Sequence, residues 1–244
     1  MRIILILALL AGGGGGARAA EKYVVTMTAV KGGVSYSHSQ TNVVGDTNNF
    51  LGEAEASRGK APRIIFNSLL RRGADGALVL DYMFELSGEH RDRPPYESVA
   101  SLHLEPGGSL LAASAGGYKY YLKLAGGPRK TAKPASKAGP NYRLTADLSC
   151  GKERFTAALA AVPGTQCNVL LNTPVEAGLT RRLINLLPGK PDKDGAFELQ
   201  YQAEIDPPEG AKASLLGAIR IKPGDKPAEV KSRGCVLRLK AEAL

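Results

Sequence analysis

The stretch Asp194-Gly195-Ala196-Phe197-Glu198-Leu199-Gln200-Tyr201-Gln202-Ala203-Glu204-Ile205 occurs twice in this chain of 244 residues, and its other copy runs from Asp75 to Leu86. Each copy begins with an Asp-Gly pair, which is typical of a tight turn, and continues as a run of alternating residues. In the later copy Phe197, Leu199 and Tyr201 share one face, as in an antiparallel strand with one buried face. Both copies are therefore predicted to be a turn followed by a long strand.

Further matches follow the same spacing along the chain. Tyr142-Arg-Leu-Thr145 repeats Tyr23-Val-Val-Thr26, and Arg182-Leu-Ile184 repeats Arg63-Ile-Ile65, both 119 residues apart. The matches fall in order on turns and strand starts, where residue type is physically constrained, and they indicate a tandem duplication. The alternative is one larger β domain whose strands resemble one another.

A period of two residues dominates the pattern, and no apolar run of helical period is sustained. We expect an all-β fold of two tandem antiparallel β-sandwich-like domains, 21–124 and 142–244, joined by a basic linker rich in Pro, Gly and Lys at 125–141. Val79 and Met83 make the second face of the first copy's strand partly apolar. They are predicted to contact the other domain.

The first twenty residues resemble a secretory signal peptide. Arg2 supplies a positive start, an apolar run follows to Ala11, and Ala17-Arg18-Ala19 fits a cleavage site. The apolar run is shorter than the roughly 20 residues that span a bilayer, so cleavage is favoured over an uncleaved anchor. We expect a periplasmic or secreted protein with no transmembrane span after cleavage.

Charge argues against a nucleic-acid partner. The formal net charge of +9 falls to +7 without Arg2 and Arg18, and residues 125–141 alone carry +4. The chain has no Trp and few aromatic residues on which bases could stack. For an exported protein, an unknown protein or an anionic envelope polymer is the expected partner, and the oligomeric state is left open.

The cysteines Cys150, Cys167 and Cys235 all lie in the second half, where export favours one disulfide and one remaining thiol. Cys150 and Cys167 are near in sequence, but in a meander of three strands they lie at opposite ends of the sheet. Pairing of the first strand of the half with the last would place Cys235 beside Cys150. The Cys150–Cys235 pairing is therefore favoured, and Cys150–Cys167 or no bond remain open.

No pattern of catalytic or metal-binding residues stands out. His38 and His103 lie on strands, His103 facing solvent, and His90 lies in a loop beside Glu89 and Asp92, so no metal or cofactor is expected. Cys167 has no histidine in its own half to activate it. Glu53 and Glu55 share a strand face, which favours a solubilising role over glycoside hydrolysis.

Two surfaces remain. Ser35, Ser37, Ser39 and Thr41 form a row of hydroxyl groups that could bind glycan, but an exposed edge kept soluble is favoured. Arg71-Arg72 and Arg181-Arg182 are interpreted as edge protection first and an anion site second.

The sequence therefore favours a non-enzymatic exported envelope protein whose two β modules bind a partner or serve in assembly. The alternative is a hydrolase or enzyme inhibitor with a site in the loops 88–96 and 206–212. Flat sheet edges would favour strand addition to a partner, and a cleft with converging carboxylates or histidines would favour an enzyme.

Overall fold

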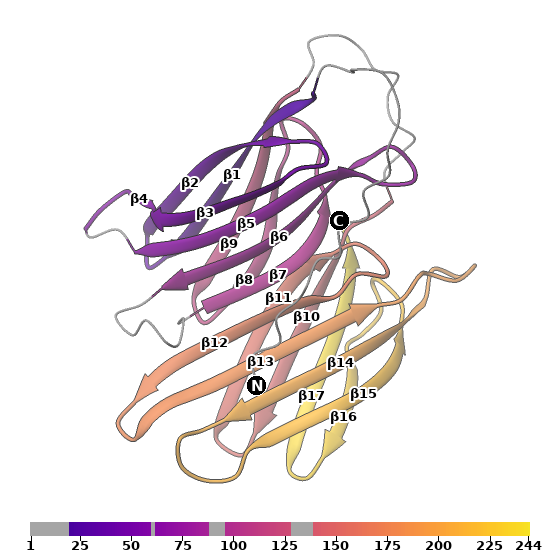
Figure 1. Cartoon of the computed structure of the whole chain (residues 1–244). Coiled ribbons are helices and arrows are strands. Elements are labelled where there is room, and N and C mark those ends of the chain that lie inside the picture. Colours follow the sequence, from indigo (N-terminus) through magenta and orange to yellow (C-terminus); the bar gives the residue numbers. More distant parts are fainter. Residues whose placement is uncertain (1–19, 60–61, 88–95, 128–138) are drawn as a thin grey trace.

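The protein folds as two antiparallel β-sheets packed face to face (Figure 1). This computed structural model describes residues 20–59, 62–87, 96–127 and 139–244, which contain strands and no helix. The first half contributes β1 (Lys22–Lys31), β2 (Val34–Val43), β3 (Thr47–Glu53), β4 (Glu55–Ala56), β5 (Arg63–Arg72), β6 (Leu78–Ser87), β7 (Tyr96–His103), β8 (Ser109–Ala115) and β9 (Tyr118–Gly126). The second half contributes β10 (Tyr142–Cys150), β11 (Glu153–Ala161), β12 (Cys167–Val175), β13 (Gly178–Pro188), β14 (Phe197–Asp206), β15 (Ala213–Ile221), β16 (Ala228–Ser232) and β17 (Cys235–Ala243).

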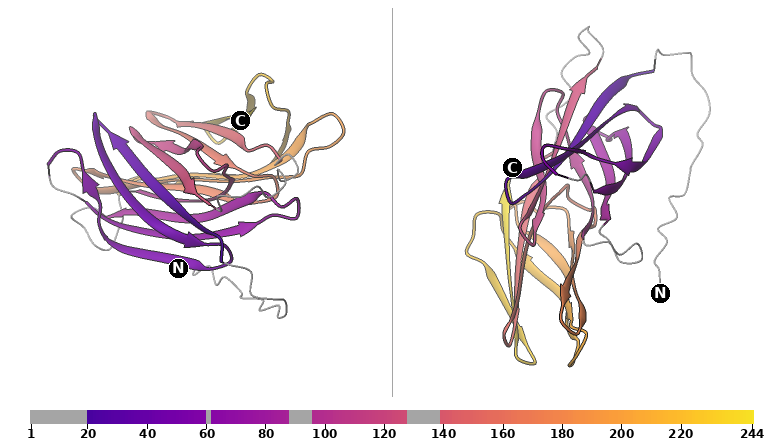
Figure 2. Two further views of the ribbon diagram at one scale, coloured as in Figure 1. Left: turned by 90° about the horizontal axis from the view of Figure 1, so that it is seen from above. Right: turned by 90° about the vertical axis from the view of Figure 1, so that its left-hand side faces the viewer.

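Both sheets run without a break through the two halves. The nine-stranded sheet has the order β16-β17-β10-β11-β8-β9-β1-β2-β4, and the eight-stranded sheet has the order β15-β14-β13-β12-β7-β6-β5-β3. Figure 1 shows the first half above the second, and the right-hand view of Figure 2 shows the two layers from the side. The expected all-β antiparallel fold is confirmed, but the sheets do not divide into two separate domains. The expected linker lies largely outside the described residues, and its first two residues end β9.

Equivalent strands follow the same order in each half. The nine-stranded sheet reads β8-β9-β1-β2 in the first half and β16-β17-β10-β11 in the second, and the eight-stranded sheet reads β7-β6-β5-β3 and β15-β14-β13-β12. Strand registers agree as well, because Ala29 pairs with Tyr120 and Leu148 pairs with Leu237, residues displaced by 119 and 117. The halves therefore lie side by side, head to tail.

One sequence match is not equivalent in space. Arg63 is exposed on β5, whereas the side chain of Arg182 on β13 reaches Glu153 on the opposite sheet at 2.7 Å. Inward-facing residues are even-numbered on both β5 and β13. A displacement of 119, an odd number, would relate an inward-facing residue of one strand to an outward-facing residue of the other. The matching tripeptides thus point to opposite faces, as expected for a slip of one residue in a strand.

The halves are joined by antiparallel pairing in both sheets. β12 pairs with β7, setting Leu171 opposite Tyr96, and β11 pairs with β8. Tyr96 is fully buried and stacks on Tyr120 with ring centroids 4.1 Å apart. The turn residue Gly116 has a φ of 57°, and a Cβ there would lie 2.6 Å from Leu171 Cδ2. Glycine is required there both by the turn and by close packing of the halves.

A single core extends through this join. Its buried side chains run from Tyr23 on β1 to Ala241 on β17 and include residues of both sheets and both halves. Burial alternates along most strands, as on β1 and β10, because one face of each sheet packs inward and the other meets solvent. Val79 and Met83 lie on β6, which pairs with β5 and β7. The join lies on β7 and β8, and a contact of Val79 and Met83 with the second half stays a prediction.

The disulfide joins Cys150 and Cys235, the pairing that the strand geometry favours. The two residues are direct partners of β10 and β17. At the equivalent place in the first half, the Lys31 ammonium lies 4.1 Å from the centre of the Tyr118 ring. A cation–π contact there is worth about 0.5–1 kcal/mol, so the disulfide provides a stronger form of the same cross-strand link.

Removal of the disulfide should destabilise the protein without changing its fold. The bond closes a loop with a sequence separation of 85 residues, and the Cys150→Ser/Cys235→Ser protein should lose about 2–5 kcal/mol of unfolding free energy in urea. Alkylation under non-reducing conditions provides the control, because Cys167 is buried. The folded protein should take up no alkyl group and the unfolded protein one, at Cys167. Modification of Cys150 or Cys235 would contradict the assigned pairing.

Candidate functional site

The histidines, carboxylates and free cysteine considered as candidate catalytic or metal-binding residues do not come together in the described structure. His38 lies on the inner face of β2 and stacks on Phe50 with ring centroids 3.5 Å apart. His103 lies on β7, where its main chain exchanges two 2.9 Å hydrogen bonds with the Asn141 side chain. It is half-buried on the outer face of β7, between the buried side chains of Leu102 and Leu104. Burial lowers the pKa of both imidazoles. His90 lies outside the described residues.

The carboxylates and the free thiol do not converge either. Glu53 ends β3 in the eight-stranded sheet, whereas Glu55 on β4 pairs with Ser37 in the other sheet, so their expected common strand face is wrong. Burial raises the pKa of the Cys167 thiol to about 12, which suppresses the thiolate. Among the residues described, no group of three His, Cys, Asp or Glu side chains could hold a metal.

The paired arginines lie within the eight-stranded sheet and not at its edges. Arg71 forms a bidentate pair with Asp81, and Arg72 binds Glu21. Arg182 binds Glu153, and Arg181 lies 3.6 Å from Glu204. Since β5 and β13 each have a neighbour on both sides, the edge-protecting interpretation is wrong. Their bonds are structural contacts within and between the sheets.

The row of hydroxyl groups on β2 is engaged with the neighbouring strand. Thr26 and Ser39 hydroxyls lie 2.9 Å apart, and Thr28 and Ser37 hydroxyls lie 3.2 Å apart. These cross-strand pairs stabilise the outer face of the nine-stranded sheet.

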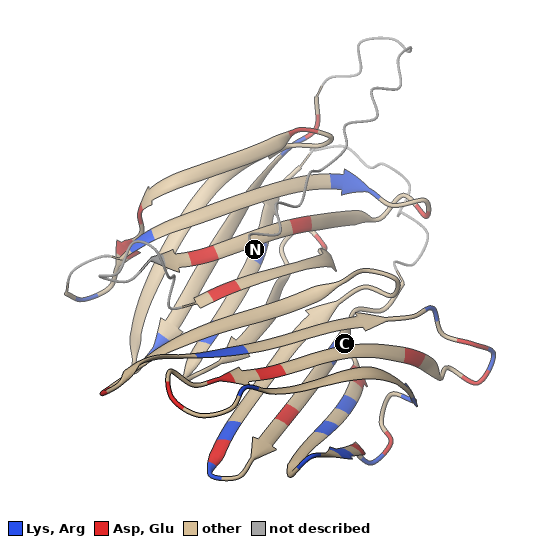
Figure 3. Ribbon diagram, turned by 60° about the horizontal axis from the view of Figure 1, so that its bottom comes forward, with Lys and Arg blue, Asp and Glu red and all other residues tan. Residues whose placement is uncertain are grey.

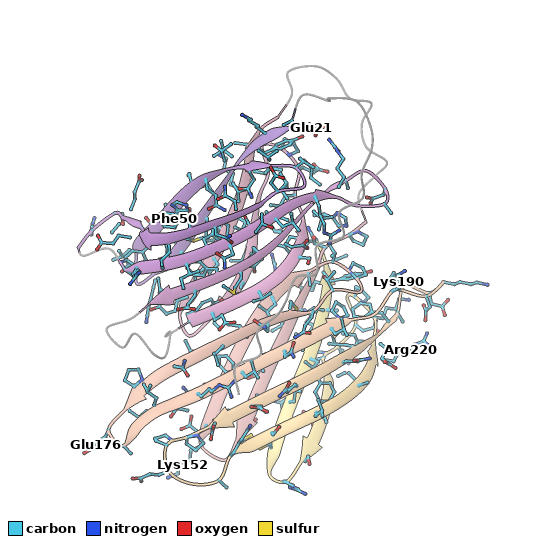
Figure 4. The ribbon with its side chains drawn as sticks, in the orientation of Figure 1. Glu21, Phe50, Lys152, Glu176, Lys190 and Arg220 are labelled. Atoms are coloured by element: carbon cyan, nitrogen blue, oxygen red, sulfur yellow. A yellow bond between two sulfur atoms is a disulfide. The ribbon has the colours of Figure 1, made fainter. Side chains whose placement is uncertain are left out.

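The inner face of the same strand carries a buried polar cluster. The side-chain amides of Gln40 and Asn42 both donate to the Ser68 hydroxyl oxygen on the facing sheet, at 2.6 Å each. The equivalent residues of the second half, displaced by 119, are Leu159 and Ala161, which are buried in the apolar core. The polar residues occupy the end of the sandwich nearest Phe50, which Figure 4 labels. The sequence pattern does not predict this cluster, because it depends on Ser68 of the facing sheet lying opposite Gln40 and Asn42.

The four outer edges of the sheets differ in how they are protected. At one end of the nine-stranded sheet, β4 pairs with β2, Ser57 donates its main-chain N–H to the Ser35 carbonyl at 2.8 Å, and Asn48 donates to the Thr41 carbonyl at 2.6 Å. At its other end, β16 is short and carries Glu229 and Lys231. Charged or covered edges of this kind resist pairing with another chain.

Within the described residues, the edge strands of the eight-stranded sheet carry charge only near one end, at Arg220 on β15 and at Glu53 on β3. β15 presents seven residues from Ala213 to Ile219 without a charge or a proline, and Leu216 at its centre is 79% exposed. β3 at the opposite edge carries no charge from Thr47 to Gly52, and Leu51 is 57% exposed. A long uncharged edge strand with an exposed apolar side chain favours pairing with another strand.

Loop 206–212 is anchored beside β15 through Glu204. The Glu204 carboxylate is 6% exposed, accepts a hydrogen bond from Gln202 and lies 2.9 Å from the Lys212 ammonium. Burial alone would raise the pKa of Glu204, but Lys212, Gln202 and Arg181 outweigh it and lower the pKa below its usual value. The other proposed loop, 88–96, lies outside the described residues except for Tyr96.

Figure 3 shows Lys and Arg together with Asp and Glu scattered over the strands and turns. Within the described ranges, no helix is long and apolar enough to cross a membrane. Comparison of the chain with protein-family models, curated proteins and solved structures finds no match. Within the described residues, the edge strands β15 and β3, with the exposed Leu216 and Leu51, are the candidate binding features.

Glu204→Gln should destabilise the protein by about 1.5–3 kcal/mol at pH 7, because the neutral amide cannot make the charge-assisted contacts of the buried carboxylate with Lys212 and Arg181. A lowered pKa in the folded state stabilises the protein above the unfolded pKa of about 4.3. That contribution is lost as the pH falls through the lowered folded value. The difference between wild type and Glu204→Gln in urea unfolding should therefore shrink below about pH 4. Glu198→Gln, an exposed change on the same strand, is the control and should stay near wild type at both pH values. A pH-independent loss in Glu204→Gln would contradict the ionic role.

Proposed function

We propose that the chain is an exported, non-enzymatic envelope protein that binds a protein partner by strand addition at the open edge of its eight-stranded sheet, on β15. In this mode an extended segment of the partner pairs with the edge, where main-chain hydrogen bonds provide affinity and alternate side chains provide specificity. The observation that carries the proposal is the exposed, uncharged edge from Ala213 to Ile219 with Leu216 at its centre.

The contrast between the two sheets supports β15 as the binding element. Each edge of the nine-stranded sheet is covered by a crossing segment or carries charges, as β4 and Glu229 do. Protection at some edges and an uncharged, solvent-exposed run on β15 are expected if β15 has a partner, because unprotected edges otherwise lead to aggregation. Gly217 also leaves little side-chain bulk there, and a Cβ at this position would lie 2.7 Å from the Tyr201 hydroxyl.

Export and duplication complete the proposal. The signal-like start of the sequence and the disulfide between Cys150 and Cys235 both favour a periplasmic or secreted location, where disulfides persist. We further propose that the two halves are tandem sandwich-like units, the second a duplicate of the first. The common strand order supports this proposal. An anionic polymer remains the second partner class, and the basic residues on which it rests lie between 129 and 137 in the undescribed segment.

Leu216→Lys should abolish partner binding while leaving the fold intact, because a charge on an edge strand opposes pairing and this side chain already faces solvent. Immobilised wild type and Leu216→Lys would be compared in affinity capture from an envelope extract. Val175→Lys is the matched control, because Val175 is also exposed, at 43%, on a strand within the sheet. Proteins retained by wild type and Val175→Lys and lost with Leu216→Lys would support the proposal. Equal retention by all three would contradict it.

A further inference from the structure

We propose that the strand added at β15 comes from a second copy of this chain. β3 of one molecule pairs antiparallel with β15 of the next and continues the eight-stranded sheet. This inference rests on the proposed function and names its partner. The two strands lie at opposite ends of the same sheet, so each molecule offers one of each. Figure 4 labels Phe50 on β3 and Arg220 on β15, which mark these two ends.

The internal join between the halves provides the template. Within the chain, β12 of the second half pairs with β7 of the first. β12 is the equivalent of β3, and β7 is the equivalent of β15, by their places in the strand order of each half. The chain therefore already contains one β3-like edge paired with one β15-like edge. Its two open edges are the same two kinds of edge without their partners.

Register can be carried from the internal join to the proposed one. Asn168 pairs with Val99, and Leu170 pairs with Glu97. Residues of β12 are numbered 119 above their equivalents on β3, and residues of β15 are numbered 117 above their equivalents on β7. These two differences convert the pairs of the internal join into pairs between molecules. Asn49 then lies opposite Leu216 of the next molecule, and Leu51 lies opposite its Ser214. Continuation by two residues sets Glu53 opposite Lys212, two residues of opposite charge.

Exposure of the equivalent residues follows the presence of the partner strand. Leu170 and Val99, on the outer face at the internal join, are each half-buried. Their counterparts Leu51 and Leu216 are 57% and 79% exposed. In the proposed register Leu51 and Leu216 are diagonal neighbours on one face, a distance that long side chains can bridge. Each would cover the most exposed apolar side chain of the other edge.

The contact is heterologous and does not close on two molecules. Each added copy leaves a free β3 at one end and a free β15 at the other, which generates open chains. The covered and charged edges of the nine-stranded sheet restrict the contact to the eight-stranded sheet. The alternative with the same partner is a two-fold dimer in which β15 pairs with β15, and it differs in its stoichiometry.

Sedimentation of the purified protein tests self-association. Wild type and Val175→Lys should show a weight-average mass that rises above twice the chain mass as concentration increases to about 100 µM. Leu51→Lys and Leu216→Lys should each remain at the mass of one chain, because each has lost one edge. A wild type that stays monomeric over this range would overturn the inference. If capture by wild type still depends on Leu216, the proposed function survives with a different partner.

A mixture of the Leu51→Lys and Leu216→Lys proteins tests the head-to-tail arrangement directly. Each variant keeps the edge that the other has lost, so the mixture should form a complex of two chains and no more. This complementation also shows that both variants are folded. A Leu51→Lys protein that dimerises alone would indicate pairing of β15 with β15 and would overturn the head-to-tail arrangement, as would a mixture that stays monomeric.

Cross-linking tests the register. Directly opposed residues of antiparallel strands have Cα atoms about 4.5–5.5 Å apart, within the range of a disulfide. A mixture of Leu51→Cys and Ser214→Cys proteins should therefore form a mixed disulfide dimer under mild oxidation, and neither variant should do so alone. Leu51→Cys mixed with Leu216→Cys is the control, because diagonal partners are about 7–8 Å apart. Preferential linkage of 51 to 216 would contradict the register.

Discussion

The pairing of β12 with β7 is the interaction on which the rest of the structure depends. Each half contributes four strands to the eight-stranded sheet. Within its own half, β12 pairs only with β13 and β7 pairs only with β6, so each needs the other half for its second neighbour. The pairing places Leu171 against Gly116 and buries Tyr96 among the aromatic rings of β6 and β9. Main-chain hydrogen bonds hold the halves together across a sheet that would otherwise have two more open edges, and the shared core makes each half part of the other's interior.

The same arrangement explains why equivalent positions hold different residues. Leu159 and Ala161 face a continuous core at the join, whereas their counterparts Gln40 and Asn42 lie at the end of the sandwich and bind Ser68. A terminal unit of a repeat commonly differs from internal units, because its outer side meets solvent. In the nine-stranded sheet both outer edges are protected, one by β4 and the other by the charges on β16. In the eight-stranded sheet Leu51 and Leu216 are exposed, as expected for edge residues whose partner strand is missing. The proposed self-association would supply that strand.

The sequence predicted the strands well because their alternation reflects burial on one face. The Cys150–Cys235 pair could also be inferred, since it needs only that the first and last strands of the half be neighbours. The continuous sheets could not be inferred, because pairing between β12 and β7 depends on which edges meet in space. Arg63 and Arg182 show a similar limit, because a slip of one residue reverses the strand face without altering the local pattern. The uncharged run of β15 is visible in the sequence, but its place at the end of a sheet is not, because that place depends on which strands pair in space.

Thermal unfolding measured by calorimetry tests the central claim that the two halves form one structural unit. At a concentration low enough to keep the protein monomeric, the joined sheets predict a single transition in which calorimetric and van't Hoff enthalpies agree. Tyr96→Ala, at the join, should lower its midpoint without splitting it. Two transitions in the wild type, one of which is unaffected by Tyr96→Ala, would show that the halves fold as separate domains and would contradict the account.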